Sequence, residues 1–142
     1  MPFHPYIAFA GNCREAFTRY QEIFGGELVM MSMTDMPADE APPADKADLV
    51  IHAQLSSSGQ RLMGADDISG QFDGNNHGMC TNYSAATVDD AKRVWEALSD
   101  GGSVQMPLGE TFFSPAFGMC TDRFGAPWMV ATDQPDQPEA AA

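Results

Sequence analysis

Basic residues are scarce in this sequence. Seven Lys and Arg stand against 20 Asp and Glu, which gives a formal net charge of −13 at pH 7. A surface this acidic repels the phosphate backbone of nucleic acids and the headgroups of anionic lipids. We therefore expect neither a nucleic-acid partner nor a membrane partner.

Long apolar runs are also absent. No stretch of the sequence approaches the roughly 20 consecutive apolar residues that a transmembrane helix needs. The first residues, Met-Pro-Phe-His-Pro, have neither the basic start nor the apolar run of a secretory signal. The three cysteines, Cys13, Cys80 and Cys120, are too scattered for a zinc knuckle or an obvious disulfide framework. These absences predict a protein of a reducing, cytoplasmic compartment.

A nucleotide-binding glycine fingerprint is missing as well. Gly25-Gly26 and Gly101-Gly102 follow predicted helices, whereas the loops that bind dinucleotides or S-adenosylmethionine precede them. Acidic residues gather in residues 34–48, where five carboxylates are accompanied by Lys46 alone. We interpret this segment as a solvated loop. A cation-binding loop is the alternative, although the spacing matches no calcium-loop pattern.

What is present predicts short strands and two amphipathic helices. One helix is predicted over residues 13–24, with Asn12 as its N-cap, and the other over residues 90–99, after a turn at residues 88–89. The predicted strands are residues 6–10, 27–33, 49–56, 61–65, 81–87, 103–107, 116–121 and 127–132. Residues 69–78 are expected to form a linker, and residues 134–142 a disordered tail.

The second half of the chain repeats the first. Ala16, Tyr20 and Ile23 recur 75 positions later as Ala91, Trp95 and Leu98. The pattern Gly59-x-x-Leu62-Met63-x-Ala65-x-Asp67 recurs 66 positions later as Gly125-x-x-Trp128-Met129-x-Ala131-x-Asp133. Matches in the same order indicate a duplicated β-α-β-β-β unit. We predict one α+β domain over residues 1–133, with its units at about residues 3–68 and 79–133.

Further motifs extend from about residue 6 to residue 130. They are Cys13-x-Glu15-Ala16-x-x-x-Tyr20-x-x-x-Phe24-Gly25-Gly26, Ile51-His52-Ala53, Trp95-x-x-Leu98-Ser99-x-Gly101-Gly102, Met106-Pro107-Leu108, Glu110-Thr111-Phe112-Phe113 and Phe117-Gly118-Met119-x-x-Asp122-Arg123-Phe124-Gly125-x-Pro127-Trp128. With these motifs the chain resembles the PhnB-like branch of the vicinal oxygen chelate superfamily, which includes glyoxalases, bleomycin-resistance proteins and extradiol dioxygenases. The resemblance implies a curved, eight-stranded mixed sheet around a small-molecule pocket.

The resemblance also implies where a metal would bind. Metal-using members of the superfamily take ligands from the first and last strands of each unit, and these places match Tyr6, Met63, Tyr83 and Met129. Phenol and thioether are poor ligands for zinc, nickel, magnesium or iron. We therefore expect no metal cofactor, with a divalent metal possible but disfavoured. A thioether copper(I) site is conceivable, although abundant methionine more often indicates adaptable packing.

The predicted pocket is apolar with a few polar groups. Alternation places His52 and Gln54 on one strand face, so His52 is a candidate general base or a hydrogen-bonded wall residue. Glu110, if buried nearby, would complete an acid/base pair, and otherwise is an exposed loop residue. The other predicted pocket residues are Tyr6, Met63, Tyr83, Phe112, Phe113, Cys120, Trp128 and Met129.

Two functions from different classes follow. The first is metal-free binding of a small organic molecule. The second is an enzyme of the same superfamily, lyase- or dioxygenase-like, that uses His52 with or without a divalent metal. No residue pattern supports methyl transfer. Uncovered sheet edges predict a homodimer, and the Phe- and Met-rich residues Met30, Met31, Met33, Phe112 and Phe113 are candidates for its interface.

Overall fold

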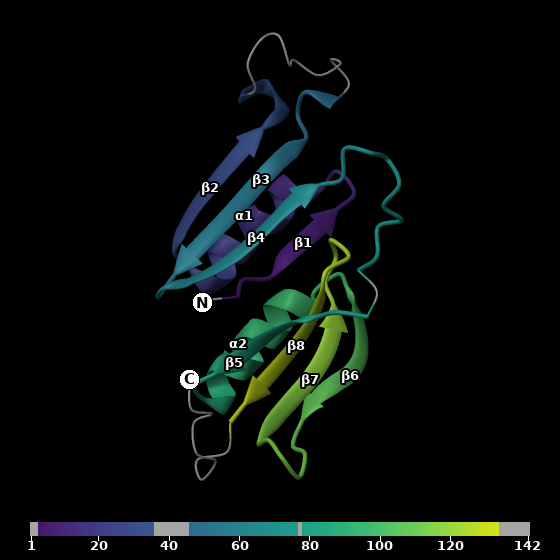
Figure 1. The fold of residues 1–142 in the computed structure, drawn as a ribbon. Helices are drawn as coiled ribbons and strands as arrows, with labels where there is room; N and C mark the ends of the chain where they lie inside the picture. The colour runs from purple at the N-terminus through teal and green to yellow at the C-terminus, as the bar shows by residue number, and fades with distance from the viewer. Residues whose placement is uncertain (1–2, 36–45, 77, 134–142) are drawn as a thin grey trace. The chain divides into compact units, whose positions relative to one another are not determined.

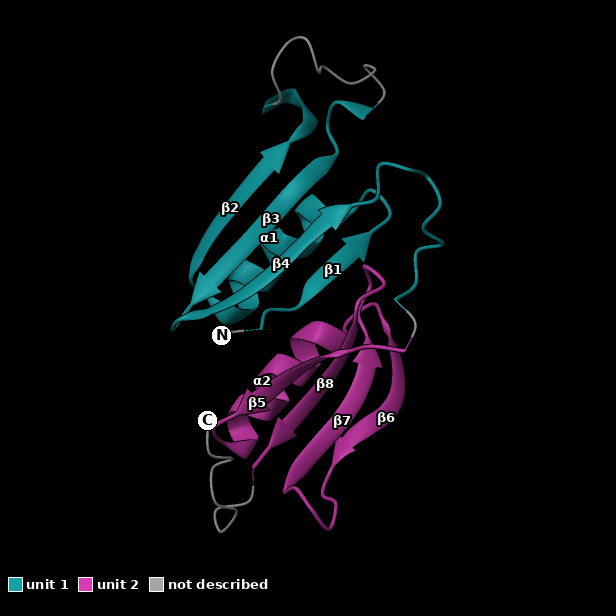
Figure 2. Ribbon diagram, viewed as in Figure 1, with its two compact units in different colours: residues 1–76 teal, residues 77–142 magenta. Residues whose placement is uncertain are grey.

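The structure is a computed structural model, and it describes residues 3–35, 46–76 and 78–133. The chain divides into two compact units, Met1–Asn76 and His77–Ala142 (Figure 2). The boundary lies within the predicted linker at residues 69–78. The predicted tail at 134–142 and the central part of the acidic segment, 36–45, lie outside the described residues.

The described residues of unit 1 form four strands and one long helix, which can be followed in Figure 1. In chain order they are β1 (Tyr6–Phe9), α1 (Cys13–Phe24), β2 (Glu27–Ser32), the short 3₁₀ helix η1 (Met33–Asp35), β3 (Val50–Ser57) and β4 (Gln60–Asp66). The strands lie in the order β1-β4-β3-β2. β1 runs parallel to β4, and the other neighbours are antiparallel. The result is a small mixed sheet with α1 on one face.

Unit 2 repeats this topology. Its elements are β5 (Thr81–Ala85), α2 (Val88–Ser99), β6 (Ser103–Gly109), β7 (Ala116–Thr121) and β8 (Pro127–Thr132). The order β5-β8-β7-β6 and the parallel β5–β8 pair match unit 1. The predicted α+β fold of two β-α-β-β-β units is therefore confirmed. The eight strands are shared between two four-stranded sheets.

The helix boundaries test the sequence prediction closely. α1 spans the predicted residues 13–24, but Asn12 provides no side-chain cap. α2 begins at Val88, two residues before the prediction, and the predicted turn at residues 88–89 is wrong. The reason is Thr87, whose hydroxyl accepts a hydrogen bond from the Asp90 backbone N–H at 3.1 Å and so caps the helix there.

The core of unit 1 lies between α1 and one face of the sheet. Ile7 and Phe9 on β1 are buried, as are Phe17 and Tyr20 of α1. The Phe9 and Phe17 rings meet edge to face with centroids 6.0 Å apart. In unit 2 the buried residues of α2 are Ala91, Val94 and Leu98. No helix among the described residues is long and apolar enough to cross a membrane.

Asp66 ties three elements of unit 1 together. One carboxylate oxygen accepts the backbone N–H groups of Gly11 and Cys13 at 3.0 Å each, and the other accepts that of Val50 at 2.8 Å. Because Asn12 does not cap α1, the carboxylate at the end of β4 supplies the acceptor that the helix start needs.

Asp122 organises the last turn of unit 2. It accepts the backbone N–H groups of Phe124 and Ala126, at 2.9 and 3.0 Å, and the indole N–H of Trp128 at 2.9 Å. Residues 122–126 therefore form the β7–β8 hairpin turn, as the sequence predicted.

The three thiols occupy unlike environments. Cys80 is exposed, whereas Cys13 and Cys120 are buried. Burial, reinforced by Asp66, raises the pKa of Cys13 to about 12, and burial, reinforced by Asp122, raises the pKa of Cys120 to about 11. Because only the thiolate is nucleophilic, both buried thiols are inert at neutral pH.

We therefore expect iodoacetamide at pH 8 to alkylate Cys80 alone in the native protein, and all three cysteines in denaturant. Intact-protein mass spectrometry counts the labels, and peptide mapping assigns them. A Cys80→Ser variant that stays unlabelled in the native state is the control. Rapid native labelling of Cys13 would contradict the burial of the α1 start.

Candidate functional site

The face of the unit 1 sheet that lies opposite α1, here called the open face, carries the candidate site. The strand register fixes its membership. Gly64 and Ala53 are paired and point toward α1, where a Cβ on Gly64 would meet the Phe17 ring. Their alternating neighbours therefore lie on the open face. These are Tyr6 and Ala8 on β1, Met63 and Ala65 on β4, and His52 and Gln54 on β3.

A hydrogen bond joins two of the predicted site residues across this face. The Tyr6 hydroxyl lies 3.2 Å from His52 Nδ1, and the two ring centroids are 5.8 Å apart. The strand between them, β4, presents Ala65 to this face, and its small side chain leaves room above it. Burial raises the pKa of the Tyr6 phenol, so it remains protonated at neutral pH. The pair thus supplies one hydrogen-bond donor and one acceptor to a ligand whichever group donates within it.

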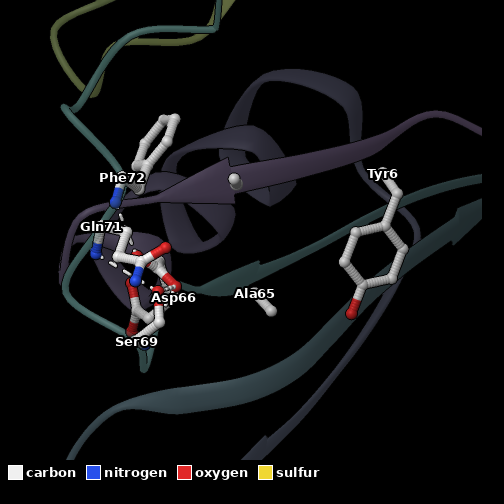
Figure 3. Close-up of a pocket in the computed structure, with 8 residues that line it drawn as sticks. Tyr6, Ala65, Asp66, Ser69, Gln71 and Phe72 are labelled. Atoms are coloured by element: carbon white, nitrogen blue, oxygen red, sulfur yellow. Dashed lines mark hydrogen bonds between the residues drawn. The ribbon is translucent and has the colours of Figure 1, made fainter.

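A hollow of about 460 Å³ opens beside Tyr6, the member of this pair that lines it (Figure 3). Ala65 lies between Tyr6 at one end and the residues that follow β4 at the other, and Ala8 also lines the hollow. The complete lining is Tyr6, Ala8, Ala65, Asp66, Asp67, Ser69, Gln71 and Phe72. The volume is in the range of small-molecule sites.

The far wall of the hollow is a loop organised by Asp67. One carboxylate oxygen accepts the Ser69 backbone N–H at 3.0 Å and the Ser69 hydroxyl at 2.7 Å, and the other accepts the Phe72 N–H at 2.8 Å. These hydrogen bonds, led by that of the Ser69 hydroxyl, lower the pKa of Asp67 to about 2. Asp67 is therefore a carboxylate throughout the physiological range.

Unit 2 does not repeat this chemistry on its own open face. Met119 pairs with Met129 in unit 2 as Gln54 pairs with Met63 in unit 1, so Met119 corresponds to Gln54. Phe117, two residues before Met119, therefore occupies the position that His52 has in unit 1. Asn82, rather than Tyr83, pairs with Met129 as Tyr6 pairs with Met63. The predicted equivalence of Tyr83 with Tyr6 is therefore corrected by one residue.

Tyr83 instead contacts the helix of its unit. Its hydroxyl donates to Asp90 of α2 at 2.6 Å. Burial and this hydrogen bond raise the pKa of Tyr83, and the same bond lowers the pKa of Asp90. Two more predicted pocket residues, Cys120 and Trp128, are buried opposite each other on the α2 side, and Trp128 donates to Asp122. Cys120 and Trp128 are therefore core residues of unit 2 and do not line a pocket on its open face.

The remaining predicted residues lie at the surface of unit 2. Phe112 is exposed, and Phe113 packs edge to face between Phe112 and Phe117, with centroid distances of 5.1 and 5.0 Å. Glu110 is exposed in the segment between β6 and β7. Because Glu110 and His52 belong to different units, their acid/base pair stays a prediction. Gln54 donates to the Ser56 hydroxyl at 3.2 Å within β3.

The residues at the superfamily's metal positions do not fit a divalent ion. With the corrected register they are Tyr6, Met63, Asn82 and Met129, which supply a phenol, two thioethers and an amide. Among the described residues, no group of three His, Cys, Asp or Glu side chains is arranged to hold a metal. This donor set lacks the imidazoles and carboxylates that zinc, iron and nickel prefer.

Sequence reasoning missed the far half of the hollow. Asp66 and Asp67 fall between the predicted strand at residues 61–65 and the predicted linker at residues 69–78, and neither was predicted as a site residue, because their role depends on pairing between β4 and β1. One signal was available: Asp67 closes the repeated Gly59 pattern, which marks the position as part of the duplicated unit.

Comparison with known proteins places the chain. Residues 2–131 match the profile of the family described as 3-demethylubiquinone-9 3-methyltransferase. The chain belongs to this PhnB-like family. It is 33% identical to Protein YjdN of Escherichia coli (strain K12), over 96% of this chain and 100% of that protein.

Solved structures agree with this assignment. Protein PA1353 from Pseudomonas aeruginosa is 41% identical and superposes with a TM-score of 0.85, covering 94% of this chain and 98% of that one. A putative 3-demethylubiquinone-9 3-methyltransferase, PhnB protein, from Bacillus cereus is 27% identical with a TM-score of 0.73, covering 93% and 99%. Glyoxalase-related proteins at 14% and 16% identity share the fold of this PhnB-like chain. The resemblance seen in the sequence is confirmed.

Proposed function

We propose that this PhnB-like protein binds a small organic molecule in the hollow on the open face of unit 1, without a metal. The hydrogen-bonded pair of Tyr6 and His52 beside a hollow of about 460 Å³ carries the proposal. Apolar Ala8 and Ala65 bind the body of the molecule, and the pair orients one polar group. The thioether and amide groups at the superfamily's metal positions support binding that needs no metal.

A second candidate is an enzyme that uses His52 for acid/base chemistry, and the same hydrogen bond favours it. The hydrogen bond to the Tyr6 hydroxyl orients the imidazole, and a general base must be held in a defined orientation toward the proton that it abstracts. Methyl transfer, named in the family's description, has less support. Gly25-Gly26 and Gly101-Gly102 follow α1 and α2, so neither pair forms a phosphate-binding loop before a helix.

A fragment titration followed by NMR tests the proposal. We expect small aromatic fragments to shift the Met63 methyl and the His52 ring signals of methyl-labelled protein, and chelator treatment to leave the shifts unchanged. His52→Ala should weaken binding about tenfold, since it removes a hydrogen-bonding partner worth roughly 1–2 kcal/mol. S-adenosylmethionine, added separately, should cause no shift.

Three results would argue against the proposal. The first is that no fragment perturbs the open face of unit 1, the second is that binding disappears with the chelator, and the third is that His52→Ala binds as well as the wild type. Met129→Leu is the matched control, because it alters the open face of unit 2 and leaves the hollow intact. Turnover of a bound fragment that His52→Ala abolishes would favour the enzyme.

We propose further that the protein is cytoplasmic and forms a homodimer. Exposed apolar residues at the sheet edges support the dimer. β2 and β6 are edge strands, with Met31 of β2 and Met106 of β6 both more than 40% exposed. Phe112 and Phe113 are further exposed apolar residues of unit 2, whereas Met33 is buried in unit 1 and leaves the predicted interface. We expect light scattering to give twice the 15.3 kDa chain mass. A monomer at tens of micromolar would refute the dimer.

A further inference from the structure

On the basis of the proposed function, we propose that the hollow of unit 1 takes an organic cation. Its ammonium group lies at Asp67, and its apolar body lies along Ala8 and Ala65 toward Tyr6. Among the residues that the structure describes, the lining contains two carboxylates, Asp66 and Asp67, and no Lys, Arg or His. A bound anion would therefore face like charge, whereas a cation is attracted.

The two carboxylates are not equivalent. Asp66 is buried, and its charge is directed at the backbone N–H groups of Gly11, Cys13 and Val50, which include the start of α1. Its negative charge is offset by these dipoles. Asp66 therefore holds the fold of the wall and contributes less to the ligand.

Asp67 keeps its charge available. Among the ion pairs of the described residues none involves Asp67, and its partners are Ser69 and the backbone around Phe72, all neutral. The neighbouring cation, Lys46, bonds instead to the Ile68 carbonyl at 3.2 Å. Three neutral donors fix the carboxylate in place, so little conformational entropy is lost when a cation approaches it.

The rest of the hollow fits an apolar body with a polar end. Figure 3 shows Ala65 between the loop of Ser69, Gln71 and Phe72 at one end and the Tyr6 ring at the other. Two alanines leave an apolar floor, and the face of the Tyr6 ring is a surface that aromatic or cationic groups favour. An elongated amine with an aromatic body matches this order of groups.

Three probes of one shape separate charge from size. They are 2-phenylethylamine, which is a cation at pH 7, the neutral 2-phenylethanol, and the anion 3-phenylpropionate. We expect the amine to bind about tenfold more tightly than the alcohol, and the anion to bind most weakly. Sodium chloride should weaken the binding of the amine and leave the binding of the alcohol unchanged, because salt screens only interactions between charges. NMR titration of wild-type protein measures all three.

Asp67→Asn should reduce amine affinity about tenfold and leave the alcohol unaffected. Asp73→Asn is the matched control, since Asp73 is exposed outside the hollow and also accepts a backbone N–H two residues ahead, that of Asn75. If Asp67→Asn unfolds the loop, the salt dependence of the wild type still decides.

The outcomes separate the two proposals. An alcohol or a carboxylate that binds in the hollow as tightly as the amine, or an amine affinity that ignores salt, overturns the cation assignment while the proposed function stands. If these probes and the fragment set of the preceding section all fail to shift the open face, the proposed function fails first. Amine binding that depends equally on Asp67 and Asp73 would indicate a diffuse acidic surface and overturn the site.

Discussion

Asp66→Asn is expected to lower the free energy of unfolding by about 3 kcal/mol, the largest effect of any polar substitution in unit 1. The wild-type carboxylate accepts three backbone N–H groups through its two oxygens; the hydrogen bonds from Cys13 and Val50 are buried, and that from Gly11 is part-buried. An amide keeps one oxygen and turns an NH₂ group toward N–H donors. At least one donor is then left without an acceptor, at a cost of roughly 1–3 kcal/mol each.

The consequence is not confined to one hydrogen bond. Cys13 begins α1, Gly11 lies two residues before it, and Val50 begins β3, so the carboxylate holds both element starts against the end of β4. Loss of the negative charge also removes its interaction with the positive end of α1. Both effects act in the same direction.

Urea unfolding at pH 7, followed by circular dichroism, measures this change. Asp73→Asn is the control, because its carboxylate is exposed and accepts the Asn75 backbone N–H in a loop, and we expect a change below about 0.5 kcal/mol. Equal stability of Asp66→Asn and the wild type would show that Asp66 does not hold the start of α1.

The helices and hairpins were predictable because their causes are local. The apolar spacing of Phe17, Tyr20 and Ile23 defines one helix face, and turn residues separate the strands that pair in sequence. The repeat then predicted that unit 2 follows unit 1. Where a prediction missed, as at the start of α2, a single side chain, Thr87, decided the boundary.

The site was predicted unevenly because its two halves depend on different kinds of pairing. Alternation along β3 placed His52 and Gln54 on one face, and the structure adds the Tyr6 hydroxyl across β4. The wall around Asp67 depends on the parallel pairing of β1 with β4, which no local pattern reveals. In unit 2, an error of one residue in register moved Tyr83 from the α2 side to the open face.

Substitution of Gly26, which follows α1, or of Gly102, which follows α2, is expected to destabilise the protein for a reason that the sequence did not reveal. Gly26 and Gly102 were predicted as helix stops. In the structure a Cβ on Gly26 would collide with the Ser56 carbonyl oxygen, and one on Gly102 with the Thr121 carbonyl oxygen. Both obstacles are backbone atoms of the neighbouring strand, β3 or β7, so rotation of a side chain cannot relieve them.

We expect Gly26→Ala and Gly102→Ala each to lower the free energy of unfolding by about 3 kcal/mol or more, because a strand must move to admit the methyl group. Gly26 has φ +92°, which adds backbone strain, whereas Gly102 tests the collision without it. Gly109→Ala is the control, since a Cβ there meets nothing closer than 4.0 Å. Urea unfolding of the three variants decides the matter. If Gly102→Ala were as stable as Gly109→Ala, the close approach of the helix exit to β7 would be wrong. If Gly26→Ala alone were destabilised, the strain of its backbone, rather than the collision, would be the cause.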